Sequence, residues 1–466
     1  MSLDSFFHLK ENNTKVSTEI IAGLTTFFAM AYILAVNPNV LGATGMPFGA
    51  VYLATIISTC IGCLLLGLFA NVPLAQSAGL GLNAFFAYTV VLMLGFTWQE
   101  GLAMVFICGI LNMIITLTKI RTYLIASVPK VLKTAIGCGI GIFIAYIGLL
   151  NVGFINFGAG VPAIDWAGIA TNPVIWLFLI GLALTVILAV LKIKGAMIIS
   201  IIATTLIGLI PVFGVTSIDA SVSFLDACAD LPETFCAIFT DKGLISLFTA
   251  DLARLPIVII TIITFSLIDM FDTIGTIIGT GRAMNLFSDA EIEEMKHGKR
   301  FHTRTERALV ADATATVVGS IVGTSNITTF VESSAGVEEG GRTGLTAVIV
   351  AICFAICAFL VPFASVVPGA ATAPILVIVG ILMLKPFAEI EWKKLEVAIP
   401  CFFTSVFMAL CYSITDGIAV GFFTFCIIKL FKREAKEVHP MVWGIAILFL
   451  IYFVARSLII GGVWTF

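Results

Sequence analysis

The sequence predicts an all-α polytopic membrane protein made of two inverted seven-helix repeats. Three observations lead to this fold class: charged residues are scarce, long apolar runs recur, and basic residues gather on one side of those runs. Of the 466 residues, 60% are hydrophobic and 11% are charged, whereas soluble chains carry about 25% charged residues. The formal net charge of −3 also excludes a nucleic-acid-binding protein, which would present a basic face.

The apolar runs are long enough to cross a membrane, which takes about 20 residues of helix. Seven runs precede a polar outer loop at 216–254, and seven follow it. The first seven cover 19–41, 48–70, 73–94, 97–118, 129–150, 173–192 and 195–215. The second seven cover 255–280, 304–322, 324–340, 342–363, 370–386, 395–414 and 416–431. A further run at 441–463 contains Arg456, so it is either an extra crossing or an interfacial helix.

The basic residues predict the orientation of these runs. With segment 1–18 in the cytoplasm, the basic clusters fall in cytoplasmic loops, as the positive-inside rule requires. The outer loops 42–47, 151–172 and 364–369 hold no Lys or Arg. The cytoplasmic clusters are Lys119, Arg121, Lys130 and Lys133; Lys192 and Lys194; Arg282, Lys296, Lys299 and Arg300; Arg342; Lys385, Lys393 and Lys394; and Lys429, Lys432, Arg433 and Lys436. We therefore expect a multi-pass protein of the plasma (cytoplasmic or inner) membrane, with a cytoplasmic N-terminus and a basic linker opening the C-terminal segment 432–466.

The two sets of seven runs form an inverted repeat, because an odd number of crossings reverses the second half. Two short segments match across the halves, Gln76–Gly79 and Ser333–Gly336. They lie in the third and tenth runs, which mix Pro, Gly, amide and β-branched residues and so predict short extended segments that lead into half-helices. The positive ends of two half-helices near the bilayer midplane form a polar binding site. The alternative is that both runs are weak helices packed in the bundle.

Four acidic residues lie deep in the predicted spans: Asp269, Asp272, Asp312 and Glu332. The first fourteen spans hold no deep Lys or Arg to pair with them, and all four histidines lie in loops or tails. Charges at this depth are costly, so carboxylates without basic partners are candidate proton carriers or Na⁺ ligands. The alternative is a structural role, in which hydroxyls and backbone amides satisfy each carboxylate.

Aromatic side chains lie beside polar groups in the first and third runs. Phe28 follows Thr25–Phe27, and Asn83 precedes Phe85 and Phe86. A flat heteroaromatic substrate would stack on such a ring and donate its N–H groups to carboxylates. Most of the 38 phenylalanines are nevertheless expected to face lipid or neighbouring helices.

The cysteines indicate no metal site. Nine of the eleven lie in apolar runs and are expected to pack as small hydrophobic side chains. Cys228 and Cys236 share the polar outer loop, and the sequence leaves open whether they form a disulfide. We expect no cofactor, with a proton as the coupling ion and Na⁺ as the alternative.

Around these residues the chain resembles the AzgA-type purine permeases, a branch of the nucleobase–ascorbate transporter superfamily. The similarity runs from about Phe7 to Pro440. Its most specific segments are Gly23–Tyr32, Ser77–Phe86, Asp269–Thr273 and Phe330–Val337.

The resemblance implies a division into two domains. A substrate-binding core would comprise 19–118 and 255–363, and a gate domain would comprise 119–215 and 364–431. The gate domain often provides a homodimer interface in this family. Members import guanine, hypoxanthine or adenine together with protons, so the implied partners are a purine nucleobase and the lipid bilayer.

The resemblance also implies site residues. Glu332, Asp272, Asn83, Phe28 and Ser333 would bind the purine. Asp272 and Glu332 would couple the proton, with Asp269 and Asp312 in support. The sequence therefore predicts a purine–proton symporter that works by alternating access.

Two other functions are weaker interpretations. A transporter of another small planar or anionic solute could share the architecture, but an anion would favour a basic residue where Glu332 lies. An intramembrane enzyme would need a nucleophile–base pair or a metal cluster at depth, and the histidines lie elsewhere.

Overall fold

The structure is a computed structural model that describes residues 3–118, 127–157, 161–217, 222–249, 254–283 and 303–460. Several predicted cytoplasmic basic residues lie outside these ranges, namely Lys119, Arg121, Lys296, Lys299 and Arg300. The side chains of Arg282 and Arg456 are likewise outside the part that is described.

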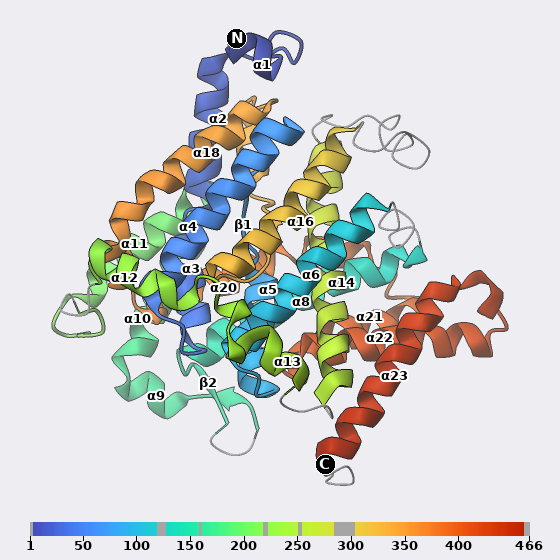
Figure 1. Cartoon of the computed structure of the whole chain (residues 1–466). Coiled ribbons are helices and arrows are strands. Elements are labelled where there is room, and N and C mark those ends of the chain that lie inside the picture. Colours follow the sequence, from blue (N-terminus) through green and yellow to red (C-terminus); the bar gives the residue numbers. More distant parts are fainter. Residues whose placement is uncertain are drawn as a thin grey trace.

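The described chain is mainly helical (Figure 1), which confirms the predicted helical class. The helices of the first half are α1 (Leu3–Phe7), α2 (Val16–Met30), α3 (Ile33–Gly42), α4 (Phe48–Leu64), η1 (Leu65–Ala70), α5 (Leu80–Ala84), η2 (Phe85–Met93), α6 (Trp98–Leu117), α8 (Lys130–Asn151), α9 (Trp166–Thr171), α10 (Pro173–Val190) and α11 (Ala196–Gly208). The loop that follows holds α12 (Phe224–Thr234), η4 (Ala237–Phe239), η5 (Asp241–Ile245) and α13 (Ser246–Thr249).

The second half has a similar run of helices. These are α14 (Leu255–Ala283), α16 (Arg304–Val322), α17 (Ser333–Glu338), α18 (Gly344–Cys357), η7 (Ala358–Leu360), α19 (Val361–Ser365), α20 (Gly369–Leu382), η8 (Lys385–Glu389), α21 (Leu395–Leu410), α22 (Ile414–Phe431), η9 (Ala435–Glu437) and α23 (Pro440–Ile460). Within the described ranges, nine helical segments are long and apolar enough to span a membrane, and four shorter ones are apolar. The count of fourteen crossings stays a prediction.

The third and tenth runs contain short strands, as the sequence predicts. Strand β1 (Gln76–Ala78) pairs antiparallel with β4 (Ile327–Thr329), with Ser77 opposite Thr328. Each strand leads into a short helix, α5 or α17. All six strand residues are buried, so the irregular backbone lies where protein surrounds it, as membrane depth requires. A second small pair, β2 (Ile155–Asn156) and β3 (Ala163–Ile164), lies in the predicted outer loop.

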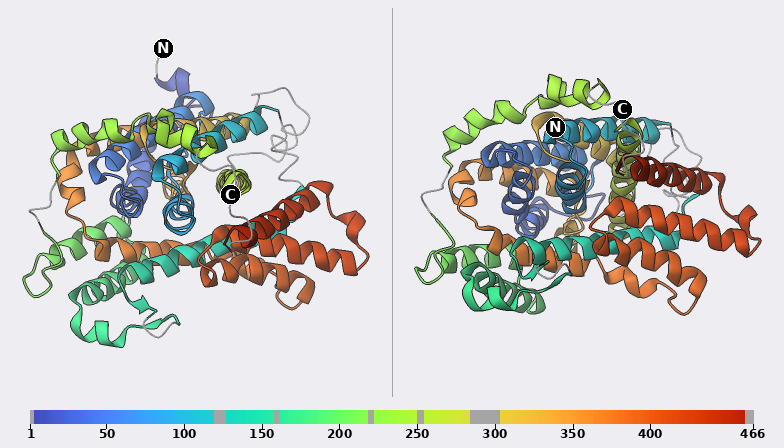
Figure 2. Two further views of the ribbon diagram at one scale, coloured as in Figure 1. Left: turned by 60° about the horizontal axis from the view of Figure 1, so that its bottom comes forward. Right: turned by 90° about the horizontal axis from the view of Figure 1, so that it is seen from below.

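The helices pack in two groups, which Figure 2 shows as two layers. One group contains α2, α4, α6, α16 and α18, and the other contains α8, α10, α20, α21 and α22. In the second group Gly141 of α8 faces Gly380 of α20, and a Cβ on either would overlap the other's carbonyl oxygen. Such small-residue contacts let membrane helices approach closely when no hydrophobic effect drives them together. Helix α14 contacts both groups, through α6 and α16 on one side and α8 on the other.

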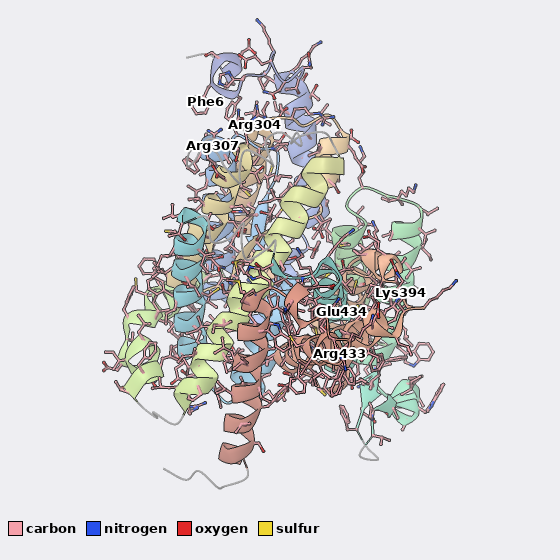
Figure 3. The ribbon with its side chains drawn as sticks, turned by 90° about the vertical axis from the view of Figure 1, so that its right-hand side faces the viewer. Phe6, Arg304, Arg307, Lys394, Arg433 and Glu434 are labelled. Atoms are coloured by element: carbon pink, nitrogen blue, oxygen red, sulfur yellow. The ribbon has the colours of Figure 1, made fainter. Side chains whose placement is uncertain are left out.

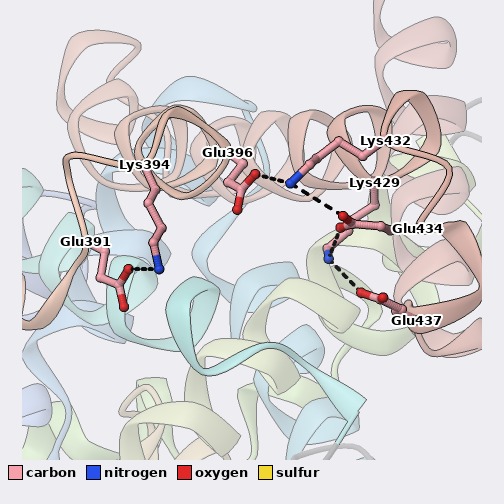
Figure 4. Close-up of polar contacts among 7 residues, drawn as sticks. All are labelled: Glu391, Lys394, Glu396, Lys429, Lys432, Glu434 and Glu437. Atoms are coloured by element: carbon pink, nitrogen blue, oxygen red, sulfur yellow. Dashed lines mark hydrogen bonds and ion pairs between the residues drawn. The ribbon is translucent and has the colours of Figure 1, made fainter.

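The predicted C-terminal run forms one helix, α23, which packs against α22 and α14. An ion-pair network lies just before it (Figure 4), in which Lys432 contacts Glu396 and Glu434 while Lys429 contacts Glu434 and Glu437. Lys429 and Lys432 hold the pKa of Glu434 below its usual range. The network therefore ties α21 and α22 to the linker that precedes α23. The sequence left the crossing of 441–463 open, and it stays open.

The two loop cysteines do not form a bridge in the structure. Cys228 on α12 and Cys236 just after it are both free thiols. The possibility of a disulfide in the outer loop is therefore not realised here.

Candidate functional site

A cavity of about 260 Å³ lies beside the strand pair. Its walls come from β4 and the turn to α17, from the start of α5, from α14, and from the end of α20. Tyr32, in the break between α2 and α3, also reaches it. Exposed Leu382 and Lys385 lie at its mouth, so the cavity opens toward the end of α20 that the positive-inside rule assigns to the cytoplasm.

Glu332, the residue directly before α17, lines this cavity. The Tyr32 hydroxyl donates a 2.7 Å hydrogen bond to its Oε1 atom. Tyr32 is 1% exposed, and its ring centroid lies 6.4 Å from that of Phe330. The structure therefore holds Glu332 with a neutral hydroxyl donor, in a wall that also contains an aromatic ring.

Asp272 lines the same cavity from the middle of α14. It forms a side-chain hydrogen bond with Thr328 of β4. The two carboxylates come from segments sixty residues apart in sequence, and the strand pair brings them to one cavity. This is the pair that the resemblance names as both binding and coupling residues.

Asp269 lies one helical turn before Asp272 but does not line the cavity. It is fully buried, and Asn112 of α6 donates a 2.6 Å hydrogen bond to its Oδ2 atom. The Ser266 hydroxyl donates in turn to the side-chain amide oxygen of Asn112. Asp269 therefore connects α14 to α6.

Asp312 is also fully buried away from the cavity. Thr273 of α14 donates to its Oδ1 atom at 2.8 Å, and Gln76 of β1 donates to the same atom at 3.3 Å. Gln76 also reaches the Thr329 hydroxyl across the strand pair at 3.3 Å. Asp312 therefore lies behind the strands and connects them to α14 and α16.

Two predicted binding residues lie near the cavity but do not line it. Asn83 is fully buried and donates to the Asn37 side chain at 2.6 Å, while Ser325 donates to the side-chain amide oxygen of Asn83. The Ser333 hydroxyl accepts a 3.0 Å hydrogen bond from the Ala75 backbone N–H. The neighbouring Ser334 lines the cavity instead. The side chains of Asn83 and Ser333 therefore form contacts within the protein here, and their role in binding stays a prediction.

Phe28 is not among the residues that line the cavity in this structure, and its role in substrate binding stays a prediction. The buried face of α2 consists of Ala22, Gly23, Thr26 and Met30. Phe28 falls outside that face and is 49% exposed. The helix presents its small residues to α17 and α18, and Phe28 lies on another face of the helix, next to Gly195.

Three residues that the sequence does not single out are prominent in the structure. Tyr32 and Thr328 contact the cavity carboxylates. Glu19, at the start of the first run, is fully buried and accepts hydrogen bonds from the Arg342 N–H at 2.9 Å and the Thr346 hydroxyl at 2.6 Å. The polar Tyr32 within an apolar run is the available signal for the first, whereas Glu19, at the first position of the run 19–41, carries no such signal.

The cavity favours a small flat solute that carries N–H groups. Two carboxylates provide acceptors for such groups, and Phe330, Leu80 and Val379 provide apolar surface. Lys385, at the mouth, is the one basic side chain among the described residues of the lining. The described ranges hold no group of three side chains arranged to bind a metal ion.

Comparison with known families and sequences shows where this chain belongs. Residues 17–420 match the model of the Permease family. The chain is 41% identical to the guanine/hypoxanthine permease PbuO of Bacillus subtilis (strain 168) over 456 residues, which cover 96% of this chain and 99% of that protein. It is 37% identical to the adenine permease AdeP of Escherichia coli (strain K12), covering 96% and 95% of the two chains.

Solved structures share the fold at low sequence identity. The transmembrane domain of the cyanobacterial bicarbonate transporter BicA superposes with a TM-score of 0.62 at 16% identity, over 86% of this chain and 96% of that one. The anion transporter Slc26a9 from mouse superposes with a TM-score of 0.58 at 11% identity, over 89% and 68%. These similarities concern the fold alone.

Proposed function

Because this chain belongs to the Permease family, we propose that it is a secondary active transporter that imports purine nucleobases by proton symport through alternating access. Family membership makes it a multi-pass membrane transporter and sets aside the intramembrane enzyme. Relatives named as permeases of adenine or of guanine and hypoxanthine support the substrate class. The observation that carries the proposal is that Asp272 and Glu332 line one cavity.

The substrate would lie between these carboxylates with its ring against apolar side chains. Guanine and hypoxanthine present an N–H edge that suits a carboxylate acceptor, and charge-assisted hydrogen bonds of this kind are the stronger ones. Adenine presents an amine beside a ring nitrogen acceptor, which suits a protonated carboxyl group. Thr328 and Thr329 add hydroxyls, and Phe330 adds an aromatic ring to the same wall.

Proton coupling follows from the cost of charge inside the membrane. In this proposal a proton on Asp272 or Glu332 neutralises one carboxyl group while the loaded core moves. Release of base and proton on the cytoplasmic side then resets the site. Na⁺ is the alternative coupling ion, because carboxylates and hydroxyls are also ligands for hard cations.

Alternating access would use the predicted core (19–118 and 255–363) and gate (119–215 and 364–431) as moving units. Two packed groups of helices support such a division. The antiparallel meeting of β1 and β4 supports two inverted halves of seven crossings each. The opening beside Lys385 corresponds to an inward-facing state if the N-terminus is cytoplasmic. A gate-mediated homodimer is part of the same proposal.

Uptake into proteoliposomes tests the function. We expect labelled hypoxanthine, guanine or adenine to accumulate when the vesicle interior is more alkaline than the outside, and a protonophore to abolish the accumulation. Competition by unlabelled guanine, hypoxanthine, adenine and uracil then defines the preferred base. Accumulation that needs a Na⁺ gradient and ignores the pH gradient would contradict proton coupling. Transport of bicarbonate without transport of any purine would contradict the substrate class.

A further inference from the structure

A second cavity, of about 360 Å³, lies at the N-terminal end of the molecule, apart from the substrate site. Its walls come from the N-terminal segment, the end of η1, and the first turn of α16. Phe6, Arg304 and Arg307 lie close together there, as Figure 3 shows. The predicted span that ends at Ala70 places this cavity at a membrane surface.

The N-terminal segment is fixed to the rest of the protein, so the cavity has a defined wall. Phe7 and Leu9 are buried against Leu345. The Asn71 side chain donates to the Phe7 carbonyl oxygen at 3.3 Å and accepts from the Gly344 N–H at 2.7 Å. These contacts tie the segment to η1 and α18.

The two arginines have more N–H donors than the described acceptors around them use. Arg304 donates to the Asn12 side chain at 3.2 Å, and Arg307 donates to the Phe69 carbonyl oxygen at 3.3 Å. The Arg307 Nε–H is buried and has no acceptor within the described part of the chain. Among the described residues neither arginine forms an ion pair with a carboxylate, whereas a guanidinium carries five donors. A buried donor without a partner is costly, so an acceptor is expected here.

The remaining polar lining holds one acidic side chain. The His8 Nδ1 atom lies 3.3 Å from the Glu11 carboxylate, and Glu11 is the acidic residue among the described lining. The two arginines therefore dominate the charge of the cavity. An arginine pair of this kind suits a phosphate group, whose oxygens accept two N–H donors at once.

The rim of the cavity is apolar. Leu68 is 50% exposed, Phe69 is 40% exposed and Phe6 is 44% exposed. Leu68 and Phe69 belong to the end of a predicted span, so their exposed surfaces face the edge of the bilayer. A free phosphate ion would gain nothing from this rim, whereas a phospholipid would place its acyl chains along it.

We propose that this cavity binds the phosphate of an anionic membrane phospholipid, held by Arg304 and Arg307, with the acyl chains along Leu68, Phe69 and Phe6. The site is separate from the substrate cavity and does not depend on the transported solute. Binding there would anchor the N-terminal segment to η1 and α16.

The test compares lipid retention by the full chain purified from mixed bilayers of phosphatidylcholine and phosphatidylglycerol. Native mass spectrometry counts the phosphatidylglycerol that stays bound. We expect the double variant Arg304→Gln/Arg307→Gln to retain about tenfold less than the wild type, because it loses charge-assisted hydrogen bonds. The double variant Lys242→Gln/Lys393→Gln removes the same charge from exposed sites elsewhere and should retain the lipid fully. Equal retention by the arginine variant, or equal loss in the lysine control, would overturn the proposal.

Two further arms define the source of the phosphate and guard against misfolding. Inorganic phosphate added to lipid-free protein in detergent should not reproduce the rise in Tm that phosphatidylglycerol causes; if it does so fully, the site binds a free anion. Should the double variant not give a monodisperse protein, Arg304→Gln alone is measured. Undiminished lipid retention by that well-folded single variant would also overturn the proposal.

Discussion

The acidic residues of the predicted spans fall into two sets with different surroundings. Asp272 and Glu332 line the cavity beside the strand pair, and each has a hydroxyl partner, Thr328 or Tyr32. Asp269, Asp312 and Glu19 lie away from it, where amides and hydroxyls of other helices donate to them. Carboxylates that accept hydrogen bonds from several protein donors connect helices, whereas the two that line the cavity are the ones our proposal assigns to substrate and proton.

The replacement Glu332→Gln should have the largest effect on transport. It removes a charge that the proposed mechanism needs for both base binding and coupling, so we expect purine accumulation to be abolished. The weaker hydrogen bond alone would reduce binding roughly 10- to 100-fold. Proteoliposome uptake measures the loss, and Glu338→Gln, an exposed position on the same helix, is the matched control. Wild-type uptake by Glu332→Gln would show that Glu332 is not a binding or coupling residue.

The pair Asp272→Asn and Asp269→Asn sharpens the comparison within a single helix. Asp272→Asn should lose proton-driven uptake with little change in Tm. Asp269→Asn should instead lower the free energy of unfolding by roughly 1–3 kcal/mol, because the Asn112 amide loses its charged acceptor. Tm and uptake per folded molecule are measured on both variants. The division into two sets fails if the two variants behave alike.

The variant Tyr32→Phe tests whether the hydroxyl partner positions Glu332. The ring stays in the wall while the 2.7 Å hydrogen bond is lost. We expect a roughly 3- to 10-fold higher KM for uptake, as the loss of one hydrogen bond implies, with Tm nearly unchanged. Tyr52→Phe is a suitable control, because its hydroxyl donates to the Cys357 carbonyl oxygen away from the cavity. An unchanged KM in Tyr32→Phe would show that Glu332 needs no such support.

The variant Glu19→Gln tests a carboxylate of the second set, which lies away from the cavity. Glu19 lies where α2 meets α18. The neutral amide keeps the shape but weakens the hydrogen bonds from Arg342 and Thr346. We expect a loss of roughly 1–3 kcal/mol in the free energy of unfolding and unchanged uptake per folded molecule. A variant with normal Tm and no uptake would show that Glu19 takes part in transport.

The smallest effect is expected for Glu434→Gln, outside both sets. Glu434 is held by Lys429 and Lys432 at the surface (Figure 4), and exposed ion pairs contribute little to stability. Because these lysines lower its pKa, the contribution of Glu434 is present above the ordinary carboxyl pKa and disappears as the pH falls through the lowered value. Tm near neutral pH should therefore stay within measurement error of the wild type. A clear fall in Tm would show that the network matters more than its exposure suggests.

The sequence predicted most of the helices because apolar runs depend on local composition. It also predicted the strand-forming breaks in the third and tenth runs, since Pro, Gly and β-branched residues disfavour a continuous helix there. It did not predict Tyr32 as a partner of Glu332, since that contact joins residues 300 positions apart. Nor did it predict that Phe28 falls outside the buried face of α2, which depends on how that helix packs against α17 and α18.

The sequence by itself determined that this protein lies in a membrane and that a few acidic residues are buried there, because transfer of side chains from water to lipid depends on each residue's own chemistry. Only the tertiary structure decided which of those acids face a cavity. Asp269 and Asp272 differ by three positions on one helix, yet one meets Asn112 and the other meets the cavity. That distinction arises from how α6, β4 and α14 pack together, which no single segment encodes.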